Sequence, residues 1–160
     1  MNDNKKMVGI AGKVLELAGD YDSRLEVFPG RIKAWARAFA LAGKVWEKEA
    51  LEAVDAFYAS SRFTITAADV VAYCEAQPVS SSEDHVNWAL DMWIEYPYAM
   101  WIEEHTGERP PEVTVPDSVP AEERDAFIVA QHRTWLNENR DRLVALTIER
   151  SKHKVRPVFE

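Results

Sequence analysis

Apolar residues recur at every third or fourth position along most of the chain, and this spacing constrains the fold more strongly than any other feature. One such stripe consists of Met7, Ile10, Val14 and Leu17. This spacing places the side chains on one face of a helix, where they can be buried together. Valine, isoleucine and threonine do not gather in the alternating runs that are typical of strands. The sequence therefore predicts an all-α fold.

The first 78 residues are expected to form a module of four helices. The expected helices lie at about 5–19, 29–42, 46–60 and 67–77. Pro29 suits the first turn of the second helix, and Gly43 suits its end. Thr66, followed three residues later by Asp69, approximates a capping box at the start of the fourth helix. Pro78 and the serines after it mark the best internal boundary, so the module is assigned to residues 1–78.

Residues 79–160 are expected to add an aromatic-rich helical segment, a proline-rich linker and a long C-terminal helix that ends in a basic tail. A second capping signal, Ser81 or Ser82, begins the aromatic segment. Pro97 is expected to kink or split that segment. The linker is assigned to 106–119 and the long helix to about 120–152.

Charge is distributed unevenly along the chain. The formal net charge is −8, which opposes nonspecific attraction to phosphate backbones. Residues 1–78 carry 10 basic and 11 acidic side chains, residues 79–138 carry 3 and 13, and residues 139–160 carry 6 and 3. The map predicts a nearly neutral first module, an acidic middle and a basic tail, although each run also fits a solvated helix face.

The chain lacks the sequence patterns of the common catalytic and metal sites. Cys74 is the only cysteine, which excludes an intramolecular disulfide and the usual zinc modules, and its apolar position is typical of a buried thiol. The four histidines are isolated, and neither a phosphate-binding glycine loop nor a nucleophile elbow occurs. We therefore expect no cofactor, no metal and no enzymatic activity, and we assign no catalytic residue.

The helix pair at 46–60 and 67–77 has a layout shared by DNA-reading motifs and by plain helical packing modules. A reading helix presents arginine, lysine, asparagine or glutamine to base edges. The second helix of this pair offers only Gln77, at its far end, whereas Asp69 and Glu75 would face phosphates unfavourably. The pair is therefore expected to pack rather than to read DNA.

Candidate partner-binding residues fall into an aromatic set and a basic set. The aromatic set consists of Trp88, Trp93, Tyr96, Tyr98 and Trp101. Such residues anchor protein interfaces, although they also form cores, so a core for the second half is the alternative. The basic set consists of Arg140, Arg142, Arg150, Lys152, Lys154 and Arg156. It is expected to approach an acidic partner, or to make weak contact with nucleic acid through the tail.

One set of residues in the first module follows a pattern shared with a known family: Tyr21, Asp22, Trp35, Ala50, Ala53, Val54, Tyr58, Thr66 and Asp69. On these residues, the stretch 8–76 resembles the helical N-terminal module of phage-encoded replicative helicase loaders or inhibitors, and related small proteins of actinobacterial phages. The resemblance implies a non-enzymatic adaptor that binds the hexameric replicative helicase, restrains it and helps to deliver it to an origin-bound initiator. In that family the segment after the module is mobile and contributes to helicase contact, whereas here it is aromatic, acidic and helical in pattern.

Three function hypotheses remain open at this point. The first is the helicase adaptor, with the helicase as protein partner. A small DNA-binding regulator is the second, and a phage inhibitor of another host protein is the third. No stretch has the character of a signal peptide or approaches the ~20 apolar residues of a membrane span. We therefore expect a cytoplasmic protein without a membrane partner. If the gene belongs to a phage, the expected location is the cytoplasm of the host cell.

Overall fold

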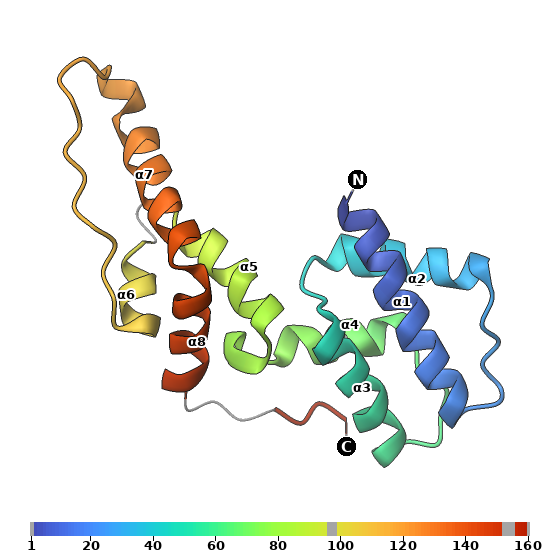
Figure 1. Cartoon of the computed structure of the whole chain (residues 1–160). Coiled ribbons are helices and arrows are strands. Elements are labelled where there is room, and N and C mark those ends of the chain that lie inside the picture. Colours follow the sequence, from blue (N-terminus) through green and yellow to red (C-terminus); the bar gives the residue numbers. More distant parts are fainter. Residues whose placement is uncertain (1, 96–98, 152–155, 160) are drawn as a thin grey trace. The chain divides into compact units, whose positions relative to one another are not determined.

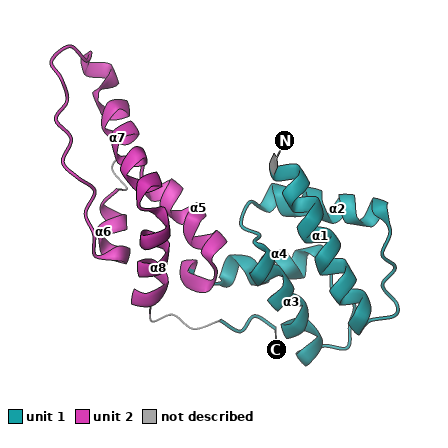
Figure 2. Cartoon of the chain, viewed as in Figure 1, with its two compact units in different colours: residues 1–78, 154–160 teal, residues 79–153 magenta. Residues whose placement is uncertain are grey.

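The computed structural model describes residues 2–95, 99–151 and 156–159. These residues contain eight α-helices, two short 3-10 helices and no strand, so the all-α prediction is confirmed. The chain divides into two compact units, Met1–Pro78 with Lys154–Glu160, and Val79–His153 (Figure 2). Each unit has its own core and is described separately.

The first unit is built from four helices, which Figure 1 labels. They are α1 (Asn2–Tyr21), α2 (Pro29–Ala42), α3 (Glu47–Ser60) and α4 (Ala67–Ala76). The α1 stripe predicted from the sequence lies on the core side, with Ile10 and Val14 buried and Met7 and Leu17 partly buried against them. Burial of these apolar faces stabilises the helices, because helices of this length are only marginally stable in isolation.

Local sequence chemistry sets the ends of these helices, as predicted. Pro29 occupies the first turn of α2, and Gly43 ends it with a left-handed backbone at φ 81°. At α4 the Thr66 hydroxyl accepts a hydrogen bond from the Asp69 backbone N–H, and the Asp69 carboxylate accepts one from the Thr66 N–H at 2.8 Å. Both halves of the capping box are therefore formed, and the start of α4 is fixed.

Buried Asp22 joins the end of α1 to α3 and to the loop before α4. Its carboxylate accepts hydrogen bonds from the Arg24 guanidinium and from the Tyr58 and Thr64 hydroxyls. The hydrogen bonds from Arg24 hold the pKa of Asp22 well below its usual value. Tyr21 stacks on Tyr58 with ring centroids 5.2 Å apart. Three of the residues that carry the family resemblance thus brace one junction.

The segment 156–159 belongs to the first unit. The side chains of Val158 and Phe159 are partly buried against its core. These residues were predicted to belong to the second half, together with the rest of 79–160. The assignment of the tail is therefore corrected, because its apolar residues are buried by helices of the first module.

The second unit contains the remaining elements. They are η1 (Val79–Ser81), α5 (Glu83–Trp93), α6 (Met100–Thr106), η2 (Ala121–Glu123), α7 (Arg124–Glu138) and α8 (Arg140–Arg150). Ser82 caps α5, because its hydroxyl accepts a hydrogen bond from the His85 backbone N–H at 3.1 Å. The core residues come from α5, α6, α7 and α8: Val86, Ala89, Leu90, Trp93, Ile94, Ile102, Leu136, Leu143 and Val144.

The predicted long C-terminal helix is two helices, and this prediction was wrong. Asn139 separates α7 from α8 with φ −119° and ψ 12°, outside the helical region. Its backbone N–H and its side-chain amide both donate to the Trp135 carbonyl, at 3.1 and 2.8 Å. An asparagine that bonds the preceding turn in this way competes with helix continuation, so the chain turns here.

Residues 107–120 connect α6 to η2 without a helix, close to the predicted linker. Gly107 ends α6 with φ 79°. The connection runs alongside α7 (Figure 1), and the His132 Nε2–H donates to the Pro111 carbonyl at 3.0 Å. The proline-rich stretch is therefore held along one flank of α7.

Candidate protein-binding surface

Helix α7 has very little of its surface buried. Leu136 is its only buried residue over 15 positions. A helix of this length in a folded unit normally buries a continuous stripe, because packing supplies most of its stability. Helix α7 therefore presents a long flank that its own unit leaves accessible.

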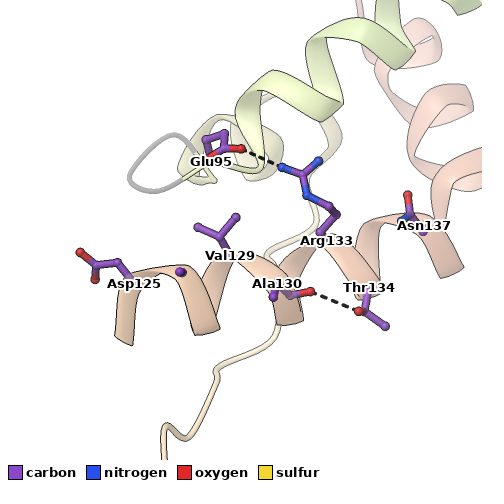
Figure 3. A pocket seen from close by; sticks show the side chains of 8 residues that line it. Glu95, Asp125, Val129, Ala130, Arg133, Thr134 and Asn137 are labelled. Atoms are coloured by element: carbon purple, nitrogen blue, oxygen red, sulfur yellow. Dashed lines mark hydrogen bonds and ion pairs between the residues drawn. The ribbon is translucent and has the colours of Figure 1, made fainter. Parts of the chain in front are cut away.

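A hollow of about 610 Å³ lies along one side of α7 (Figure 3). Its lining consists of Glu95, Asp125, Ala126, Val129, Ala130, Arg133, Thr134 and Asn137. The Arg133 guanidinium bridges to the Glu95 carboxylate at 2.8 Å and so ties α7 to the end of α5. Both side chains of this pair are partly exposed, so the pair orients the helix and adds little free energy by itself.

A second hollow, of about 400 Å³, lies between α6, α7 and the linker. Its lining consists of Ala99, Met100, Glu103, Arg109, Pro110, Pro111, Glu112, Val113 and His132. The Arg109 guanidinium donates to the Glu103 carboxylate at 3.0 Å. The two hollows and Trp101 together are called the α6–α7 surface below.

Two large apolar side chains on α6 stand at this surface. Met100 is 64% exposed and Trp101 is 41% exposed. Methionine adapts its shape to a partner, and tryptophan is enriched among the residues that dominate binding energy. Exposed apolar groups beside shallow hollows with charged edges are typical of protein-binding surfaces.

The structure separates the aromatic candidates. Trp101 is exposed, Trp88 is partly buried against the second core, and Trp93 is 3% exposed within it. The assignment of Trp93 to a partner surface is therefore corrected, because its ring faces the core. Tyr96 and Tyr98 lie outside the described residues.

The arginines of α8 are engaged within their own unit. Arg140 donates to Asp91 at 2.6 Å and to Asn87 at 3.1 Å, both on α5. Arg142 donates to Glu108 of the linker at 2.8 Å. The guanidinium of Arg150 lies over Gly107, 3.0 Å from where a β-carbon would stand. These three side chains brace the second unit rather than form a single basic patch.

The remaining basic candidates belong to the tail. Lys152 and Lys154 lie outside the described residues. Arg156 is exposed, and its backbone is hydrogen-bonded to Gln77. A role of these three side chains in binding an acidic partner stays a prediction.

The face that α4 turns to solvent is small and acidic. Its exposed residues are Ala68, Ala72 and Glu75. Base readout needs long hydrogen-bonding side chains on such a face. The exposed surface of α4 therefore does not favour DNA reading by the α3–α4 pair.

Cys74 is fully buried in the core of the first unit. Burial, with a further contribution from the neighbouring Glu49 carboxylate, raises the pKa of the Cys74 thiol to about 12. The thiol is therefore protonated near neutral pH, whereas a reactive cysteine needs a lowered pKa. Cys74 packs as a small apolar residue.

The described residues contain neither a candidate metal site nor a candidate membrane span. Within ranges 2–95, 99–151 and 156–159, no group of three or more His, Cys, Asp or Glu side chains could hold a metal ion. Among those same residues, none of the helices is both long and apolar enough to span a bilayer.

Two features, one in each unit, had no clear signal in the sequence. Met100 was not singled out, because a lone methionine in an aromatic helix fits a core as well as a surface. Gln77 was noted only as a possible base-reading residue, whereas its amide binds the backbone of Arg156. A contact between positions so far apart leaves no local pattern.

Comparison with known proteins identifies no relative. No protein-family model, curated protein or solved structure matches the chain.

Proposed function

We propose that the protein is a non-enzymatic adaptor that binds a protein partner through the α6–α7 surface. Two observations carry this proposal: Met100 and Trp101 are exposed on α6, and Leu136 is the only buried residue of α7. Desolvation of such apolar groups is the main favourable term in protein association. The charged edges of the two hollows give the contact its orientation.

The resemblance of residues 8–76 supports a specific partner, the hexameric replicative helicase. On this proposal the first unit is the family's helical module, and the second unit supplies the helicase contact. The adaptor then restrains or loads the helicase through protein contacts alone. It acts in the cytoplasm, where the helicase works.

The test is the binding of the full chain to the purified replicative helicase of the cell in which the gene is expressed. We expect the double variant Met100→Ala/Trp101→Ala to bind about tenfold more weakly or worse, because two central apolar contacts are lost. The matched control is Leu41→Ala, which removes an apolar side chain that is 92% exposed on α2 of the first unit. Biolayer interferometry measures all three affinities.

The outcome separates the hypotheses. Equal binding by all three proteins would show that the helicase is bound elsewhere than on the α6–α7 surface. Absence of helicase binding by the unmodified chain would overturn the helicase as partner and favour an inhibitor of another host protein. Salt-sensitive binding of duplex DNA in the same assay would instead support the DNA-binding regulator.

A further inference from the structure

The side-chain amide of Gln77 binds both backbone groups of one tail residue, the N–H and the carbonyl of Arg156. Its Oε1 accepts a hydrogen bond from the Arg156 backbone N–H at 2.9 Å, and its Nε2 donates to the Arg156 carbonyl at 2.8 Å. The same Nε2 also donates to the Tyr73 carbonyl at 3.2 Å, which fixes the amide on the end of α4. Gln77 is 5% exposed, so this pairing occurs away from bulk water.

An aromatic clamp holds the tail three residues further on. The Phe159 ring meets the Phe57 ring edge to face, with centroids 5.3 Å apart. It stacks on the Tyr73 ring, with centroids 5.9 Å apart and 19° between the planes. Offset stacks and edge-to-face pairs of this kind are favourable beyond the area that they bury.

These contacts have the two components of a peptide-binding site. Backbone hydrogen bonds to Gln77 select an extended segment of any sequence, and the clamp selects an aromatic residue at a fixed distance along it. All three site residues, Phe57, Tyr73 and Gln77, belong to the first unit and are called the tail site below. The bound segment reaches it through a covalent connection that is about 80 residues long.

We propose that the tail site also takes residues 156–159 of a second copy, so that two copies can exchange tails. The second copy carries the same segment and would make the same contacts. Each site then holds either its own tail or the tail of the other copy. The ratio of these two states depends on the effective concentration of the chain's own tail relative to the concentration of the other copy. Exchange of an identical element is a low-cost route to a dimer.

Two full-length variants with complementary defects test the proposal. Phe159→Ala keeps the tail site and removes the ring from the tail. Gln77→Met keeps the tail and, at nearly equal side-chain volume, removes the amide from the site. We expect a mixture of the two to form a 1:1 complex on size-exclusion chromatography with light scattering, because the intact tail of one fits the intact site of the other. Each variant alone is expected to remain a monomer.

A control and a second measurement complete the test. The control is a mixture of the Phe159→Ala variant with a chain that carries both substitutions. Neither protein in this mixture has an intact tail, so no complex should form. In addition, a fluorescent peptide of residues 152–160 should bind Phe159→Ala about tenfold more tightly than the unmodified chain, whose own tail competes. Circular dichroism verifies that each variant is folded. Equal peptide affinities for the two proteins would overturn the proposal, as would a mixture of folded variants that stays monomeric.

Discussion

The indole ring of Trp93 stacks on the imidazole ring of His105, with ring centroids 4.2 Å apart and 23° between the planes. This contact joins the end of α5 to α6. The His105 Nδ1–H also donates to the Trp101 carbonyl at 2.8 Å, which holds the imidazole ring against its own helix. Two tryptophans in neighbouring helices therefore have different roles: Trp93 forms core, and Trp101 faces solvent.

Substitution of these two tryptophans should separate stability from binding. We expect Trp93→Ala to lower the free energy of unfolding by about 3–5 kcal/mol, because it leaves a cavity in the second core. Trp101→Ala should cost about 1 kcal/mol or less, since its ring is already partly in water. Urea denaturation followed by circular dichroism measures both. Similar losses for the two variants would show that Trp101 is a core residue.

Two glycines of the first unit should respond to alanine in opposite directions. A β-carbon at Gly9 or at Gly43 would meet no atom within 4 Å, so neither substitution causes a clash. Gly9 lies within α1, where alanine is favoured by about 1 kcal/mol, so Gly9→Ala should stabilise the unit. Gly43 has φ 81°, where a β-carbon costs about 1–2 kcal/mol, so Gly43→Ala should destabilise it. Thermal unfolding gives the sign of each change directly.

Alkaline pH should destabilise the first unit through Cys74. Its pKa is about 12 when folded, against an ordinary value of 9.0, so the unfolded chain releases the proton first. The stabilising contribution is complete below pH 9 and is lost as the pH rises from 9 towards 12. Between pH 8 and pH 10 we expect a loss of about 1 kcal/mol.

The Cys74→Ala variant is the control for this pH dependence, and denaturant titrations at the two pH values measure it. It should lose less stability over this range than the unmodified chain does. Burial also raises the pKa of Tyr73 to about 12, so a smaller loss is expected to remain. An identical pH response in both proteins would rule out Cys74 as its origin.

The basic residues of the tail should contribute to partner binding in a salt-dependent way. Replacing Lys152, Lys154 and Arg156 by alanine removes three positive charges and leaves the backbone hydrogen bonds of residue 156 in place. We expect weaker partner binding at low salt and a difference that shrinks at high salt, because screening reduces interactions between exposed charges. Affinities at several salt concentrations test this, and an unchanged affinity throughout would remove the tail charges from the contact.

Features that depend on neighbouring residues were predictable from the sequence. The capping box of Thr66 and Asp69 and the left-handed end at Gly43 involve groups within a few positions, so their residue types suffice to predict them. The turn at Asn139 was not predicted, because it depends on how the asparagine amide competes with the helix. A propensity argument alone does not decide that competition.

Features that depend on distant residues were not predictable. The sequence places Trp93 and Trp101 in one aromatic helical stretch, and only the packing of α5 against α6 and α8 distinguishes the buried ring from the exposed one. The contact of Phe159 with Phe57 and Tyr73 likewise requires the folded first unit. The exposure of α7 follows from how few neighbours the second unit provides for it.

The position of the tail in the chain has a consequence for synthesis. Gln77 leaves the ribosome roughly 80 residues before Phe159, which corresponds to about 4–16 s at bacterial or eukaryotic elongation rates of about 5–20 residues per second. During that interval the rings of Phe57 and Tyr73 lack their contact with Phe159. The module therefore acquires the contacts of Phe159 only after the whole second unit has been translated.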